Sequence, residues 1–214
     1  MIINSINDIT NLLTDEYAKV NDVRLAKLFL INNGVDENDL LLKSILELEQ
    51  YLKRIYKSKE VNFLPIKNGF FSIGGRPTLD KILLLKDLGV NLVLTLLKKE
   101  EKEVEELGDF IVENNIKWIW NPLSASSLPT DTKNIERIRS IFNDLDKELE
   151  EGSKIYVHCA AGIHRTGAFT NAFLQYSGFS AEESKMMIKQ MREVTAREAI
   201  TKHWNWSKKF VSVE

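Results

Sequence analysis

The sequence predicts an α/β fold in which a central mixed or parallel sheet, flanked by helices, follows an N-terminal helical extension. From about residue 59 onward, short runs of β-branched and aromatic residues alternate with apolar-periodic stretches. This alternation is typical of strands joined by crossover helices. Before residue 59 the apolar residues recur only at helical spacing. The chain has 214 residues, which is enough for one such domain and an appendage.

The N-terminal extension, residues 1–58, is expected to contain three helices. The second of them ends at Asn33-Gly34, a typical helix stop. These helices carry no catalytic spacing, so the simplest interpretation is a helical cap packed on the main domain, residues 59–214. The alternative is a docking module for a protein partner. The apolar residues that predict the three helices are Ile6, Ile9, Leu12 and Leu13, then Val23, Leu25, Leu28, Phe29 and Ile31, then Leu42, Ile45, Leu46, Leu48, Leu52 and Ile55.

The first half of the main domain is expected to alternate between strand and helix. Glycines separate the elements, as turn residues do between periodic segments. The charges of the acidic helix in this half indicate a solvated face. The predicted elements are a turn at Asn68-Gly69, a strand over 70–73, a helix over 79–88, a strand over 90–97, the acidic helix over 100–115 and a strand over 116–120.

The second half begins with a segment, 121–131, that has the composition of a loop. The aromatic residues Trp204 and Trp206 near the end of the chain are expected to pack rather than to recognise a ligand. The predicted elements are a helix with Ile135, Ile138, Phe142, Leu145 and Leu149 on one face that ends at Gly152, a strand over 154–157, helices over 166–176 and 180–192, and a final helix carrying Ile200, Trp204 and Phe210.

The chemistry is expected in residues 159–165, the anion loop, which joins the last predicted strand to the helix that follows it. This loop begins with Cys159, the only cysteine of the chain, and ends with Arg165. A loop between a strand end and a helix N-terminus presents backbone N–H groups and a positive dipole, which favour an anion and the thiolate form of cysteine. Arg165 adds a planar fork of donors suited to phosphate oxygens. We interpret the loop as a nucleophile within an oxyanion site; the alternative is that Cys159 is a small buried hydrophobe.

The run His158-Cys159, five residues, then Arg165-Thr166-Gly167 resembles the signature loop of the cysteine-dependent protein tyrosine phosphatase superfamily, nearest to its dual-specificity branch. Gly162 and the strand–loop–helix context strengthen the resemblance. It covers about residues 62–214, strongly at 154–168 and elsewhere only as a pattern of elements. The resemblance implies a dual-specificity phosphatase-like fold and metal-independent hydrolysis of phosphate monoesters.

The same resemblance implies the roles of the loop residues. Cys159 would be the nucleophile, and Thr166 would donate its hydroxyl to the sulfur when the phosphocysteine is hydrolysed. His158 would tune the loop without transferring protons. His164 is not specified by the family pattern, and is either a polar residue near the substrate or a spacer. The groups that would hold the phosphoryl oxygens are Arg165 and the loop residues Ala160, Ala161, Gly162, Ile163 and His164.

The sequence departs from the family pattern at the position expected for the general acid. Family members carry an aspartate after the third strand, close to a Pro-hydrophobic pair such as Pro122-Leu123, but residues 124–127 here read Ser-Ala-Ser-Ser. Asp131 is the only acidic residue of this loop. We therefore take Asp131 as the candidate general acid; the alternative is that it is the N-cap of the helix that follows.

The expected substrate is phosphotyrosine, and also phosphoserine or phosphothreonine, hydrolysed through a phosphocysteine on Cys159. Without an acid, a phenolate or a phosphoanhydride leaves more easily than a serine alkoxide. The alternatives are therefore a catalytically weak phosphate-binding adaptor and a phosphoanhydride hydrolase such as an RNA 5′-triphosphatase. The apolar loop residues Ala160, Ala161 and Ile163 disfavour a multiply phosphorylated head group.

The composition of the chain narrows its partners. A net charge of −2 and the lack of a basic tract argue against nucleic acid and anionic membranes. The first residues lack the pattern of a signal peptide, and no stretch approaches the roughly 18 apolar residues of a spanning helix. Three histidines spread along the chain suggest no zinc-ligand cluster. We expect a cytoplasmic protein without cofactor, whose partners are a phosphorylated protein substrate and, in the docking interpretation, a protein bound through residues 1–58.

Overall fold

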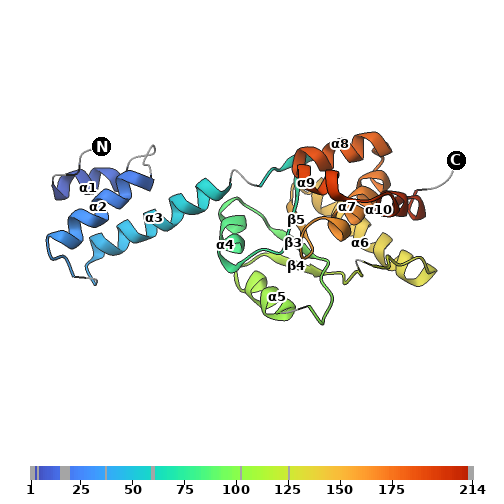
Figure 1. Cartoon of the computed structure of the whole chain (residues 1–214), viewed down its shortest axis with the longest axis horizontal. Coiled ribbons are helices and arrows are strands. Elements are labelled where there is room, and N and C mark those ends of the chain that lie inside the picture. The colour runs from blue at the N-terminus through green and yellow to red at the C-terminus, as the bar shows by residue number, and fades with distance from the viewer. Residues whose placement is uncertain are drawn as a thin grey trace. The chain divides into compact units, whose positions relative to one another are not determined.

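The computed structural model describes residues 3, 5–14, 20–36, 38–58, 61–101, 103–124 and 126–211. The chain divides into two compact units, Met1–Lys59 and Glu60–Glu214 (Figure 1). The predicted boundary between residues 58 and 59 lies one residue before this division. Lys59 and Glu60, at the predicted boundary, lie outside the described residues.

The first unit contains the three expected helices, α1 (Ile6–Leu13), α2 (Val20–Asn32) and α3 (Leu40–Ser58). Ser5 caps α1, because its side chain accepts a hydrogen bond from the Asp8 amide at 3.2 Å. The helices share a core of their own, which explains why the unit is compact. Its buried residues are Ile9, Leu12, Val23, Ala26, Leu30, Leu42 and Ile45.

The second unit is built on a five-stranded mixed sheet with the order β1-β2-β5-β3-β4. Only the β1–β2 pair is antiparallel; β2–β5, β5–β3 and β3–β4 are parallel. The predicted α/β class with a mixed sheet is confirmed. The strands are β1 (Leu64–Ile66), β2 (Gly69–Gly74), β3 (Leu92–Thr95), β4 (Lys117–Trp120) and β5 (Lys154–His158).

Helices cover both faces of this sheet (Figure 1). The unit has two hydrophobic cores, and alternate residues of the central strand β5 belong to different ones. Ile155 and Val157 belong to the larger core, and Tyr156 belongs to the smaller core. The larger core includes residues of α6 (Thr132–Glu150), α7 (His164–Tyr176) and α8 (Ala181–Met191), and the smaller core includes residues of α4 (Leu79–Asp87) and α5 (Val104–Glu113).

Three elements differ from the prediction. The short strand β1 was not expected, because three residues that include Pro65 give little alternation. The acidic helix begins at Val104 rather than at residue 100, so the described residues 96–101 and 103 lie between β3 and this helix. The single final helix is instead α9 (Glu193–Glu198), α10 (Thr201–Asn205) and the 3₁₀ helix η1 (Trp206–Lys209). Among the described residues, no helix combines the length and the apolar character needed to cross a membrane.

Candidate active site

The anion loop leaves the carboxyl end of β5, the central strand of the sheet, and enters α7. Its neighbours are the segments that follow β2 and β3, since both strands run parallel to β5 and end at the same edge. This edge is where open α/β sheets bind ligands. Cys159, the predicted nucleophile, lies here with 3% of its surface exposed. The structure therefore places Cys159 and Arg165, the two ends of the loop in which the chemistry was expected, at this edge.

The segment after β2 contacts the anion loop backbone to backbone. Gly162 has a φ of +70°, and a Cβ atom at this position would lie 2.3 Å from the carbonyl carbon and oxygen of Gly74. Only glycine satisfies both conditions. The Arg76 amide donates a hydrogen bond to the carbonyl of Ala160 at 2.8 Å. The end of β2 and the residues just after it therefore support the anion loop.

Arg165 is fixed by a carboxylate that the sequence interpretation missed. Its Nη2 donates to Glu101 Oε1 at 2.8 Å, and its Nη1 donates to Glu101 Oε2. Nη1 also donates to the carbonyls of Leu96, at 3.2 Å, and Leu123, at 3.3 Å. The guanidinium thus joins the segments that follow β3 and β4.

The charges of this pair stabilise each other. The hydrogen bonds that Arg165 donates to Glu101, and then the charge of Cys159, raise the pKa of Arg165, while burial opposes the shift. The hydrogen bonds from Arg165 lower the pKa of Glu101, and the Lys98 amide adds a bond of 2.7 Å to the same carboxylate. Glu101 was assigned to a solvated acidic helix because its Arg165 partner is distant in sequence. Its place in the segment that follows a buried strand was the available signal.

His158 is completely buried and hydrogen-bonded through both ring nitrogens. Its Nδ1 lies 3.2 Å from the carbonyl oxygen of Cys159, and because a carbonyl only accepts, Nδ1 carries the proton. Nε2 lies 2.8 Å from Thr95 Oγ1 and accepts its hydroxyl proton, while Trp118 Nε1 donates to the same oxygen. Burial lowers the pKa of His158 to about 4, so the ring is neutral near pH 7. A buried neutral ring suits a positioning role for His158.

Thr166 follows Arg165 at the start of α7 and is fully buried. Its hydroxyl has no hydrogen-bond partner among the residues described. A buried hydroxyl in this state is available to a group that the reaction brings to it. This observation is compatible with the role expected for Thr166, which stays a prediction.

Asp131 is the N-cap of α6. Its carboxylate accepts hydrogen bonds from the Asn134 amide at 3.1 Å and from Asn134 Nδ2 at 2.9 Å. These bonds, the side-chain bond first, lower the pKa of Asp131. The capping alternative is therefore present in the structure. That Asp131 also acts as the general acid stays a prediction, and a lowered pKa works against the protonated form that such an acid needs.

His164 and the loop after β4 both contact the C-terminal helices. The exposed His164 ring stacks on that of the buried His203, with centroids 4.8 Å apart and an interplanar angle of 21°. The loop after β4 is tied to the C-terminal helices, since Trp206 Nε1 donates to the Pro129 carbonyl at 2.7 Å and Lys202 Nζ to that of Ser126 at 3.4 Å. Ala125, between Ser124 and Ser126, lies outside the described residues. The predicted packing role of Trp206 is confirmed, because it belongs to the larger core.

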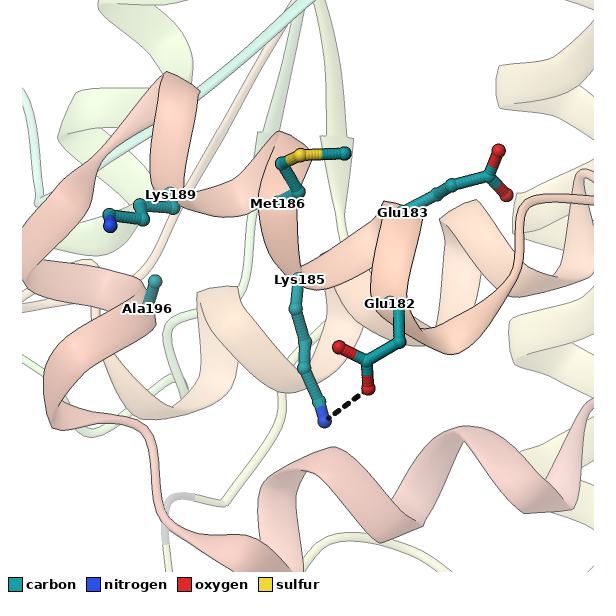
Figure 2. A pocket seen from close by; sticks show the side chains of 6 residues that line it. All are labelled: Glu182, Glu183, Lys185, Met186, Lys189 and Ala196. Atoms are coloured by element: carbon teal, nitrogen blue, oxygen red, sulfur yellow. Dashed lines mark hydrogen bonds and ion pairs between the residues drawn. The ribbon is translucent and has the colours of Figure 1, made fainter.

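A separate surface hollow lies over α8 and α9 (Figure 2). An ion pair of 3.3 Å between Lys185 and Glu182 borders it. None of its lining residues belongs to the anion loop, so we assign it no part in the chemistry. The lining residues are Glu182, Glu183, Lys185, Met186, Lys189 and Ala196.

The site is typical of the class of cysteine-dependent phosphatases. It has a buried cysteine at a strand end, an arginine at the start of the next helix, and between them a loop whose conformation requires glycine. Residues 73–206 match the catalytic domain of dual specificity phosphatases, and the chain belongs to this family. The resemblance on which the sequence interpretation rested is thereby confirmed. Membership of the family supports phosphatase activity as the general function.

Individual relatives are distant. Two viral proteins named as tyrosine phosphatases are similar: AMV078 of Amsacta moorei entomopoxvirus is 26% identical over 112 residues, covering 42% of this chain and 67% of that protein. The second, 197R of Invertebrate iridescent virus 6, is 26% identical over 101 residues, covering 47% of this chain and 37% of that protein. A solved structure of kinase associated phosphatase, with serine replacing its catalytic-site cysteine, has the same fold. Its TM-score is 0.60 at 18% identity over 70% of this chain and 92% of that chain.

Proposed function

We propose that this chain is a metal-independent protein phosphatase that hydrolyses phosphotyrosine, and also phosphoserine and phosphothreonine, through a phosphocysteine on Cys159. One observation carries the proposal: Cys159 and Arg165 lie buried at the two ends of one loop, and Glu101 holds the arginine in place. A nucleophile can attack phosphorus, and a fixed guanidinium beside it can stabilise the charge that gathers on the phosphoryl oxygens.

In the first step the Cys159 thiolate attacks phosphorus, an S–P bond forms, and the P–O bond to the substrate breaks. The leaving oxygen takes a proton from an acid or from water. Arg165 and the amides of residues 160–165 bind the three equatorial oxygens as charge gathers on them. Glu101 accepts from both Nη1 and Nη2 of the guanidinium, so the N–H groups that face the phosphate, on Nε and the second one on Nη2, are held in a fixed orientation.

In the second step water attacks the phosphocysteine, the S–P bond breaks, and inorganic phosphate leaves with the thiolate regenerated. The Thr166 hydroxyl would donate to the departing sulfur in this step. His158 would keep its Nδ1 bond to the Cys159 carbonyl throughout, because its ring is neutral and has no exposed nitrogen. These roles belong to the proposal.

The leaving group decides how much the reaction depends on an acid. A tyrosine phenolate has a pKa near 10, well below that of a serine alkoxide. The hydrolysis of phosphotyrosine is therefore slowed least when the general acid is weak. The hydrogen bonds that lower the pKa of Asp131 therefore support phosphotyrosine as the better substrate. They also favour the second candidate function, a phosphate-binding adaptor with little turnover.

The test is turnover of p-nitrophenyl phosphate and a phosphotyrosine peptide by the full chain with a chelator present. We expect activity in the wild type, none in Cys159→Ser, and retained peptide binding in that variant as the control for folding. Full activity in C159S would refute the phosphocysteine. A wild type that binds the peptide but does not turn it over would support the adaptor instead.

A further inference from the structure

Two side chains from outside the anion loop hold one of its peptide units. Thr195 Oγ1 donates a hydrogen bond to the carbonyl oxygen of Gly162 at 2.6 Å, and Arg192 Nη1 donates to the same oxygen at 2.8 Å. Arg192 Nη1 also donates to Thr195 Oγ1 at 3.1 Å, so the two donors support each other. Thr195 is completely buried. We call this pair the carbonyl clamp.

The carbonyl clamp orients a group that the reaction needs. In a planar trans peptide the C=O of one residue and the N–H of the next point in opposite directions. A Gly162 carbonyl drawn toward Arg192 and Thr195 therefore directs the Ile163 N–H the other way. The same reasoning applies two peptide units earlier, where the Arg76 amide holds the Ala160 carbonyl and so directs the Ala161 N–H.

The loop needs such a clamp because of its glycine. Gly162 is required by its positive φ and by the 2.3 Å approach to Gly74, but glycine resists rotation of its peptide less than any other residue. A rotated peptide would aim a carbonyl oxygen, rather than an N–H, at the phosphoryl group. Hydrogen bonds from outside the loop make that rotation unfavourable.

We propose that Arg192 and Thr195 are positioning residues for the anion loop, which keep the Ile163 N–H directed at the bound phosphoryl group. Arg192 is the junction between α8 and α9, and Thr195 lies within the short helix α9. The packing of these helices thus determines the oxyanion geometry at Cys159. The inference rests on the proposed function only in taking the bound anion to be a phosphoryl group. The orientation of the Gly162–Ile163 peptide does not depend on that function.

The test compares Thr195→Val, which removes the hydroxyl at nearly constant volume, with Thr195→Ser, which keeps it. The probe is tungstate, a tetrahedral oxyanion, and its Kd is measured by titration calorimetry. We expect T195V to raise the Kd about tenfold, the effect of losing a hydrogen bond and loosening a second, while T195S stays within about twofold of wild type. Alkylation of Cys159 by iodoacetamide at pH 6.5 should slow in T195V and not in T195S, because fewer aligned N–H groups stabilise the thiolate.

Arg197→Gln is the matched control, since Arg197 lies on the same helix, is exposed, and pairs with Glu198 at 2.8 Å. Should T195V fail to fold by circular dichroism, Arg192→Met, which leaves the Thr195 hydroxyl in place, decides the question by the same two measurements. Tungstate binding within twofold of wild type in a folded clamp variant would overturn the proposal. A wild type without phosphatase turnover would refute the proposed function alone, because the comparison of tungstate affinities would still stand.

Discussion

Glu101→Gln tests how far the activity depends on the carboxylate that holds Arg165. Glu101 accepts from both terminal nitrogens of the guanidinium, and its side chain is 29% exposed against 8% for Arg165. A glutamine keeps one acceptor oxygen but turns an NH₂ group toward the other guanidinium nitrogen. One charge-assisted hydrogen bond is lost, and a donor then faces a donor.

The expected loss follows from these contacts. A hydrogen bond between charged groups contributes roughly 1.5–3 kcal/mol, and we take the low end because solvent reaches Glu101. About 1.4 kcal/mol corresponds to a tenfold change in rate. Arg165 keeps its bonds to the carbonyls of Leu96 and Leu123, so the side chain stays near its place. We therefore expect kcat to fall about tenfold and KM to change less, because E101Q disturbs the orientation of the Arg165 guanidinium but leaves its positive charge in the site.

The assay is steady-state hydrolysis of p-nitrophenyl phosphate, together with urea unfolding from pH 3 to pH 7. The folded pKa of Glu101 is lowered, so its stabilising contribution is complete above the ordinary value of 4.5 and is lost as the pH falls below it. The difference in unfolding free energy between wild type and E101Q should be constant at pH 6–7 and shrink below pH 4.5. Glu105→Gln is the control, because Glu105 is more exposed and pairs with Lys99 at 3.1 Å. Equal kcat values for E101Q and E105Q would refute the reasoning.

Two further predictions concern Asp131 and His158. Asp131→Asn keeps a good N-cap, so the free energy of unfolding should not change. If Asp131 is the general acid, kcat on phenyl phosphate should fall roughly 10²-fold and the high-pH limb of the pH–rate profile should become flatter. An unchanged pH–rate profile would leave Asp131 as a cap. His158 has a folded pKa of about 4 and an ordinary value of 6.5, so the unfolded chain binds more protons between these values and acidification destabilises the native state. Relative to His158→Gln, the wild type should lose roughly 3 kcal/mol of unfolding free energy from pH 7 to pH 4, measured by urea titration; parallel curves would contradict the buried neutral ring.

The fold class was predictable because each long element carries its own periodicity. The strand that ends at His158 and the helix that begins at His164 are adjacent in sequence, so one short segment contained the nucleophile, the arginine and the glycine between them. The element boundaries that were predicted wrongly are those that depend on tertiary contacts. The acidic helix begins at Val104, later than predicted, and Glu101 ahead of it pairs instead with Arg165, a partner distant in sequence.

The supporting residues of the site could not be predicted for the same reason. Glu101 lies 64 residues from Arg165, and Thr195 lies 33 residues from Gly162. A charged or hydroxylic residue at either position fits a solvated helix equally well when only its neighbours in sequence are known. Asp131 shows the converse, since the capping pattern ahead of an apolar helix was visible locally and the structure contains that cap.

These contacts make the anion loop dependent on the whole second unit. Arg76 after β2 holds the Ala160 carbonyl, and the carbonyl clamp at α8–α9 holds the Gly162 carbonyl. Glu101 after β3 and the Leu123 carbonyl after β4 both hold Arg165. The loop has a flexible glycine at its centre and no covalent cross-link. Its geometry is therefore only as well determined as the packing of the segments around it. A substitution far from Cys159 that loosens α9 should thus reduce oxyanion affinity before it reduces the global stability of the fold, because local opening requires less free energy than unfolding.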